Sequence, residues 1–493
     1  MDANMVALVL PSISDSFTAS FQSLEWVISA YMITFASCLL PAGGFADRFG
    51  RRRILLTGLA IFCVSSVACG LAGTITALNI ARAFQGVGAA FQLTSALAII
   101  GNAFAQRPVA ARAWEIWGTC MGLTICLSPL LGGFITQLIG WKAIFLINVP
   151  LGTLIAYSVI RWIPESKAAV RRPIDVMGSV TFPLALALLI WGLISVNGDG
   201  LFSFLTLAKF SVSLALFVLF ILIQTTRQQP MVEFRLFRNP RFSAGVIGMF
   251  GYSASAQVLL SFFPLYLQTW FDLSPLMAGV SMLPFAVAMV IGPHAGNFIG
   301  RDRSAHWLLT VGLATVCAGN ILTACLVTSS HYLWVALGMS LIGFGAGMLN
   351  GTTQRAIMGA APPENTGMVS GIAQSTRFAS IVLAVGVLGA ALAQHAHAVF
   401  EVGPARSLGL NTAEAHQFLD QVLTGNGRSA GPSIDPSVHA SALLAARLSS
   451  ASGFSLALMI AALIAGTSAV LIWRLSRRPR ADLLDRPGAG AEE

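Results

Sequence analysis

Three charged side chains of this sequence stand inside apolar runs, where an ion needs a partner or water. Asp2 belongs to the first apolar stretch, Arg82 stands a few residues into a run that begins near residue 77, and Arg377 lies in a later run. A charge at mid-membrane depth costs at least ~2.5 kcal/mol, so such residues tend to be functional. A desolvated carboxyl group can exchange a proton near neutral pH, so Asp2 is the candidate proton carrier.

Arg82 and Gln85 are three residues apart and would share one face of a helix. If Arg82 is functional, its charge needs a partner or a water-filled cavity. The alternative is that Arg82 lies near a helix end and extends its side chain to the membrane–water interface. We expect a cavity lined by polar side chains, with the candidates Glu25, Gln85, Gln257, Gln354 and Arg377. Glu25 precedes Trp26, so a solvated acid at a helix start is the simpler interpretation of that residue.

A short basic turn with a single acid separates two of the apolar runs. It reads Gly-Gly-Phe-Ala-Asp-Arg-Phe-Gly-Arg-Arg-Arg from residue 43 to residue 53. Such a charge block must lie in water, and its arginines favour the cytoplasmic side. Asp47 can cap or pair with a neighbouring helix start, which predicts a latch, whereas the arginines fit membrane anchoring equally well. The gating candidates are Gly43, Asp47, Arg48, Gly50 and Arg51.

A second group of small and helix-breaking residues interrupts the run that begins near residue 114. Ser128, Pro129, Gly132 and Gly133 predict a thin, broken helix at this point. A proline frees backbone groups that a neighbour or water must satisfy, and the glycines permit close helix packing. Ordinary packing of small residues is the alternative interpretation.

The elements that position these residues are membrane-spanning helices. The chain has 493 residues, of which 56% are hydrophobic and only 10% charged, against about a quarter charged in soluble proteins. The net charge of +9 does not indicate nucleic acid, because the basic residues fall in loops between apolar runs. The seven cysteines lie inside apolar runs without a CxxC pair, which indicates neither a disulfide framework nor a metal site.

Thirteen apolar runs of about 20 residues are long enough to span a bilayer. They begin near residues 26, 54, 77, 114, 143, 176, 204, 242, 276, 306, 332, 368 and 454. Residues 3–11 form a half-length run ahead of them. Either the first helix is shortened or the true start lies upstream; a free amine and Asp2 at mid-membrane depth favour the second explanation.

An internal repeat divides the chain. Gly43 to Arg51 recurs in weaker form as Gly-Asn-Phe-Ile-Gly-Arg-Asp-Arg from Gly296 to Arg303, which implies two related halves. We predict an all-α integral membrane protein with an N-terminal six-helix half (1–170), two extra central helices (171–228) and a C-terminal six-helix half (229–473). Residues 394–452 are expected to be a long external loop with one short helix, and residues 474–493 a cytoplasmic tail.

The distribution of Lys and Arg orients the helices. When the turn at residues 43–53 is placed in the cytoplasm, most basic loop residues fall on the same side. The opposite side holds only Lys142, Lys209, Arg406, Arg428 and Arg447. The chain is therefore expected to cross the cell's inner (plasma) membrane many times, with its C-terminus in the cytoplasm.

Several motifs in their order resemble the major facilitator superfamily, in particular its fourteen-helix drug–proton antiporter branch. The turn at residues 43–53 resembles the signature between the second and third helices, and Arg82 to Ala90 that of the fourth. Ser128 to Gly133 is similar to the fifth-helix antiporter motif, although that family usually has glycine at the position of Ser128. Further resemblance comes from Met1–Pro11, Trp141, Phe145, Asn148–Pro150, and Ala361–Gly367 leading to Arg377.

This resemblance implies a secondary active transporter that exports hydrophobic drugs in exchange for protons, with Asp2 and Arg82 in proton coupling. The alternative within the family is a transporter of a metabolite or siderophore. We expect no cofactor, no resident metal and no nucleic-acid partner; the partners are a hydrophobic small molecule, protons and the bilayer, and the chain is expected to be a monomer. A membrane enzyme and a sensor are disfavoured, because the sequence has neither a phosphate-cradling loop nor a sizeable soluble output domain.

Overall fold

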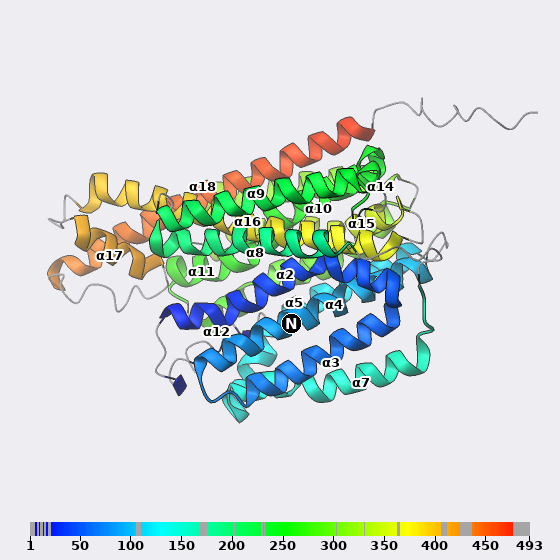
Figure 1. The fold of residues 1–493 in the computed structure, drawn as a ribbon. Coiled ribbons are helices and arrows are strands. Elements are labelled where there is room, and N and C mark those ends of the chain that lie inside the picture. The colour runs from blue at the N-terminus through cyan, green and yellow to red at the C-terminus, as the bar shows by residue number, and fades with distance from the viewer. Residues whose placement is uncertain are drawn as a thin grey trace, which may run out of the picture.

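The chain is almost entirely helical in the computed structural model (Figure 1). The structure describes residues 21–104, 110–167, 175–200, 203–227, 230, 232–273, 275–301, 303–329, 331–361, 365–405, 412–423 and 436–476, and the single positions 5, 6, 9, 13, 16 and 17. Asp2 and residues 477–493 of the expected tail lie outside this description. Every element among the described residues is a helix, which confirms the predicted all-α class.

Each of the thirteen predicted apolar runs is helical. The first seven correspond to α2 (Phe21–Phe49), α3 (Arg51–Gly70), α4 (Ile75–Ala103), α5 (Ala110–Ile139), α6 with α7 (Lys142–Leu146, Asn148–Trp162), α8 (Val176–Asp199) and α9 (Phe204–Thr226). The others are α10, the π-helical turn η2 and α11 (Pro240–Tyr252, Ser253–Gln257, Leu259–Phe271), α12 and α13 (Pro275–Ser281, Leu283–Ile299), α14 (Ala305–Leu326), α15 (Tyr332–Met358), α16 (Thr366–Phe400) and α18 (Pro436–Ser476).

The lengths and apolar composition of the helices fit a protein that crosses a membrane many times. Eleven of the described helical segments are long and apolar enough to cross a bilayer. The other two predicted runs, α5 and the pair α12 and α13, are helical as well. Many leucines, isoleucines and valines of these helices face outward, as a protein surrounded by lipid requires.

The helices form two packed groups. In the N-terminal helix group, α4 packs on α2 and α3, and α3 packs on α7. In the C-terminal helix group, α15 packs between α13 and α14, and α18 packs on α14 and α16. Figure 1 shows α3, α4 and α7 on one side of the bundle and α10, α14, α15 and α18 on the other. The groups meet where α2 packs on α16 and where α5 packs on α13 and α15.

The extra pair α8 and α9 lies against the α2–α16 seam. α8 contacts both α2 and α16, and its side chains Leu186 and Ile190 are buried against Ala36, Phe378 and Ala379. α9 packs on α8. These two helices therefore cover the place where the two groups join rather than belonging to either one.

The expectation of a long loop at residues 394–452 is wrong. α16 continues to Phe400 and passes into a π-helical turn, η4 (Glu401–Ala405); α17 (Thr412–Leu423) follows, and α18 already begins at Pro436. Apolar runs mark only the ~30 Å of hydrocarbon, whereas α16, with 35 residues, is ~52 Å long. Both extensions are rich in alanine, a strong helix former.

Candidate functional site

Asp47 joins the two helix groups. Its carboxylate accepts hydrogen bonds from the backbone N–H groups of Gly367 (3.0 Å) and Met368 (2.9 Å), at the first turn of α16. The first N–H groups of a helix have no partner within the helix, and the helix dipole makes this end positive. An acid at the end of α2 therefore caps a helix of the other group, across 320 residues of sequence.

Arg51 holds this carboxylate in place. Its Nη2 and Nε donate to Asp47 Oδ1 at 2.8 and 3.1 Å, and its side chain is only 1% exposed. Arg48, by contrast, lies over the ring of Phe49. The structure thus pairs two predicted gating residues directly, and both bonds depend on the i, i+4 spacing of Asp47 and Arg51.

Two glycines of the turn have separate structural roles. A Cβ on Gly43 would overlap the backbone carbonyl of Gly367, so glycine allows α2 and α16 to touch. Gly50 has a φ of 111°, a conformation that other residues rarely adopt. It turns the chain into α3, whose first N–H groups, those of Arg52 and Arg53, donate to the carboxylate of Glu165. Sequence reasoning missed this role of Glu165.

A second polar contact joins the groups between α5 and α13. Glu115 accepts from the side-chain amide of Asn297 (2.6 Å) and lies 2.5 Å from His294 Nδ1. Thr119, one turn further along α5, lies 3.3 Å from the other ring nitrogen of His294. Sequence reasoning missed this contact, because 179 residues separate Glu115 from His294.

The two contacts occupy related positions in the repeat. α2 precedes the first copy of the basic turn and α13 precedes the second, and each packs on a long helix of the opposite group. The second copy has Gly300 where the first has Asp47. Its acid is instead on the facing helix, as Glu115. Both seams are therefore closed by a carboxylate, but from opposite sides.

Arg82 is fully buried within the N-terminal helix group. Its Nε donates to the carbonyl of Val27 (2.9 Å) and its Nη1 to Gln85 Oε1 (2.7 Å), and its guanidinium lies 4.3 Å from the ring centre of Tyr31. Gln85 in turn donates to Ser66 at 2.8 Å. The predicted contact of Arg82 with Gln85 is therefore present, and it extends into a polar network through α2, α3 and α4.

α5 remains one helix through the Ser128–Gly133 motif, so the expected break is not present. Ser128 is fully buried and its hydroxyl donates to the carbonyl of Thr124. A Cβ on Gly132 would lie 3.3 Å from the Cα of Met5, so this glycine allows α5 to lie close to Met5. The surroundings of Pro129 and Gly133 lie outside the described part.

The C-terminal helix group contains a second buried arginine. Arg377 on α16 is 1% exposed and donates from Nε to Gln257 Oε1 at 2.8 Å. Gln257 ends the π-helical turn η2, and such turns occur frequently at functional sites. Arg377 also lies 5.9 Å from the ring centre of Tyr252. The structure thus brings together two of the predicted cavity residues.

Three amides of α15 and α16 are buried without a hydrogen-bond partner among the described residues. They belong to Asn350, Gln354 and Gln374, each at most 1% exposed. Asn350 and Gln354 are four residues apart and share one face of α15. Buried amides are normally paired, so such a group needs an explanation. Amides of this kind can hydrogen-bond to a polar group of a bound molecule.

Two polar side chains of α11 form hydrogen bonds away from this cluster. The hydroxyl of Tyr266 donates to the carbonyl of Val327, and the amide of Gln268 donates to Pro264 within its own helix. The side chain of Glu25 lies outside the described residues. Of the predicted cavity residues with described side chains, Gln257, Gln354 and Arg377 lie in the C-terminal helix group, whereas Gln85 belongs to the Arg82 network.

Two groups of membrane-spanning helices, joined by capped and ion-paired seams and containing buried polar clusters, define a polytopic membrane transporter. Residues 1–385 match the family model of the Major Facilitator Superfamily. The chain belongs to this superfamily, and it is accordingly a transporter rather than an enzyme.

Relatives and solved structures agree with this assignment. The chain is 30% identical to the multidrug resistance protein Stp of Mycobacterium tuberculosis, over 81% of this chain and 74% of that protein. It is also 30% identical to the tetracenomycin C resistance and export protein of Streptomyces glaucescens, over 96% and 88%. The fold is similar to that of the proton:xylose symporter XylE (TM-score 0.58, 14% identity, 96% and 92% covered).

Proposed function

We propose that the protein exports hydrophobic, amphipathic compounds from the cytoplasm across the plasma membrane in exchange for protons. Two relatives are named for multidrug resistance and for resistance and export of one antibiotic, and they support the direction and class of cargo. The sequence motifs of the fourteen-helix branch support the coupling to protons. The observation that carries the mechanism is the Asp47 carboxylate on the first turn of α16.

The moving parts are the N-terminal half (1–170) and the C-terminal half (229–473), with residues 171–228 as extra central helices. In the observed conformation the end that contains the basic turn is held together by the Asp47 and Glu115 contacts. The charge rule places this end in the cytoplasm. In this proposal the observed state is the one closed toward the cytoplasm, and opening it requires both carboxylates to release their partners.

The energy of these contacts suits a switch. A hydrogen bond to a charged group contributes about 1.5–3 kcal/mol net, and a two-state equilibrium moves from 1:99 to 99:1 with about 5.5 kcal/mol. Two contacts of this strength can favour the closed state and still be released when cargo or a proton binds. Arg51 keeps Asp47 correctly oriented in the closed state.

Proton coupling falls to Asp2 and Arg82. Arg82 lies in a buried network that includes Gln85 and Ser66, so a change of charge nearby alters hydrogen bonds on three helices. In this proposal Asp2 carries the proton and Arg82 senses its charge. Gly132 of the Ser128–Gly133 motif lies against Met5, and in this proposal the motif limits proton leakage there.

Cargo would bind between the halves, near Arg377 and the buried amides of α15 and α16. A large amphipathic molecule needs mainly apolar contact and few hydrogen bonds. Gln257, Gln354 and Gln374 supply such hydrogen bonds, and Tyr252 adds an aromatic surface. Gln85 belongs to the Arg82 network instead, so we propose it for coupling rather than for cargo.

The experiment is transport in vesicles that contain the purified protein. With a pH gradient imposed, a lipophilic fluorescent cation should accumulate, protons should move in the opposite direction, and both fluxes should stop when the gradient collapses. Asp2→Asn should abolish the proton flux. Dye accumulation that ignores the gradient would reject proton exchange, and transport of an organic acid or siderophore but of no hydrophobic compound would reject the proposed cargo.

A further inference from the structure

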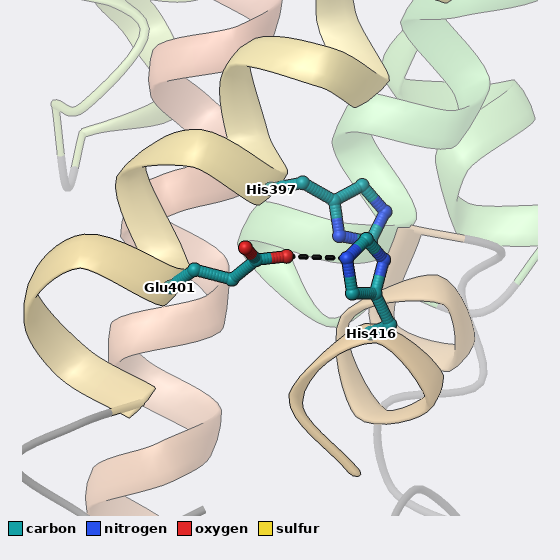
Figure 2. A group of neighbouring side chains, drawn as sticks. All are labelled: His397, Glu401 and His416. Carbon is teal, nitrogen blue, oxygen red and sulfur yellow. Dashed lines mark ion pairs between the residues drawn. The ribbon is translucent and has the colours of Figure 1, made fainter. Parts of the chain in front are cut away.

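Two histidines and a glutamate gather where α16 ends, away from both seams. His397 lies on the last turns of α16, Glu401 begins the π-helical turn η4, and His416 lies on α17. One ligand atom from each side chain lies within 4.8 Å of the other two. Figure 2 shows the carboxylate of Glu401 pointing toward His416, whose ring faces that of His397. Among the described residues this is the one group of its kind.

Local structure places the first two of these side chains together. His397 and Glu401 are four residues apart, so they share a face of α16 where it passes into the π-helical turn. The sequence contains this His-x-x-x-Glu spacing, but nothing in the sequence locates a third ligand. The expectation of no metal site rested on the absence of a complete ligand pattern.

Packing of α17 provides the third side chain. The buried face of α17 consists of Ala415, Phe418, Leu419 and Val422, and the ring of Phe418 stacks on Phe400 at 6.2 Å. His416 follows Ala415 and lies at the edge of this face, where 49% of its side chain is exposed. Apolar contacts hold α17 on α16, so His416 is positioned without help from an ion.

The three side chains lie close enough together to turn their ligand atoms toward one ion. Glu401 Oε1 and His416 Nε2 are 2.5 Å apart, and the two imidazole rings stack at 4.3 Å. Zinc binds imidazole nitrogen at about 2.0 Å and carboxylate oxygen at about 2.1 Å, so tetrahedral ligand atoms are ~3.3 Å apart. To bind an ion, Glu401 Oε1 and His416 Nε2 would have to move apart by ~0.8 Å. Rotation of the side chains can supply a shift of this size without movement of the helices.

We propose that His397, Glu401 and His416 form a binding site for a divalent transition-metal ion of the zinc class. Two imidazoles and one carboxylate are a ligand set that zinc takes, with water in the fourth position. All three side chains are partly or well exposed, so the ion has a path from solvent. Hard cations such as Mg²⁺ prefer oxygen ligands and fit this set poorly.

The site lies at the far end of α16 from the Asp47 contact. α17 lies at the left end of the bundle in Figure 1, and α18 ends at the right. Because α16 is ~52 Å long and the hydrocarbon core is ~30 Å thick, we expect its first turn and His397 to lie on opposite sides of the membrane. With the basic turn in the cytoplasm, the metal site faces the outside. A bound ion would tie α17 to α16 and stiffen this end of the C-terminal helix group.

Binding can be measured with Zn²⁺ alone. The full-length protein is purified in detergent, stripped with a chelator and titrated with Zn²⁺, with bound metal measured after gel filtration. We expect one ion per chain and a rise in the unfolding temperature. Glu401→Gln and His416→Ala should each weaken binding at least tenfold, and His416→Cys should restore it, because thiolate is a zinc ligand.

His395 provides a matched control. It lies on the same helix two residues before His397 and is not part of the cluster. His395→Ala should bind Zn²⁺ like the unmodified protein. Absence of saturable binding would overturn the proposal, as would binding that His416→Ala and Glu401→Gln leave unchanged. Because α17 is held by apolar contacts, folding of these variants can be confirmed by an unchanged gel-filtration profile without metal.

Discussion

The two carboxylate oxygens of Asp47 contact two different parts of the chain. It accepts from Arg51 in its own turn and from the N–H groups of Gly367 and Met368 on α16. The backbone N–H groups of Arg52 and Arg53, in the first turn of α3, donate to a different carboxylate, that of Glu165. Two acids thus cap two helix starts near this turn: Glu165 caps α3, and Asp47 caps α16. Only α16 belongs to the opposite helix group.

Replacing this carboxylate should impair transport. Asp47→Asn keeps the shape but removes the charge that α16 and Arg51 bind, at a cost of about 1.5–3 kcal/mol to the closed state. We expect the maximal transport rate in vesicles to fall at least about fivefold, with normal amounts of folded protein.

Arg53→Gln is the control for the Asp47 substitution, since the Arg53 side chain is 72% exposed and lies 3.8 Å from Glu165. Its transport rate should stay close to that of the unmodified protein. If Asp47→Asn transports as fast as Arg53→Gln, the basic turn acts only as a membrane anchor.

At the scale of elements, close approach of α2 and α16 depends on glycine. Gly43 lies against the carbonyl of Gly367, and Gly371 lies against the backbone of Leu39 and Leu40. Backbones that touch in this way allow the short bonds from α16 to Asp47. The α5–α13 seam is similar, since Gly118 lies against Pro293.

Adding a methyl group at Gly43 should push α2 away from α16. In Gly43→Ala the Cβ would overlap the Gly367 carbonyl, so the closed state should be destabilised by about 1–3 kcal/mol and transport should slow by about fivefold or more. A Cβ on the neighbouring Gly44 would have no other atom within 4 Å, so Gly44→Ala should transport normally. Equal rates for the two variants would show that the seam does not close during transport.

At the scale of the whole molecule, the two contacts and the metal site lie at opposite ends of the bundle. Both seams close at the end that contains the basic turn, whereas α16, α17 and α18 extend the other end. The extra helices α8 and α9 lie along the α2–α16 seam. The two ends of the bundle therefore differ: one is closed by the seams and the other is extended by helices. In the proposed orientation the closed end faces the cytoplasm.

This orientation can be tested by labelling. Arg53→Cys and Val402→Cys are made in a variant that lacks the seven natural cysteines, since both side chains are well exposed. In intact cells a membrane-impermeant maleimide should label the cysteine at 402 and not the one at 53. The reverse labelling would place the basic turn outside and overturn the proposed direction of export.

The sequence by itself determined where the membrane-spanning helices lie, because apolar runs of the right length are a local property. It also predicts their orientation, from the basic residues between the runs. It also predicted the Arg82–Gln85 contact, since residues three apart on a helix always face the same way. The superfamily followed from motifs in a fixed order, and the family match over residues 1–385 confirmed it.

Only the tertiary structure decided which distant residues meet. Nothing local links Asp47 to Gly367, Glu115 to His294, or Glu401 to His416; packing of whole helices sets these contacts. The same reason explains the error at residues 394–452, where alanine-rich helices continue past the hydrocarbon that apolar runs report. The basic turn could be recognised from sequence as a latch candidate, but its partner, the first turn of α16, became visible only in the folded protein.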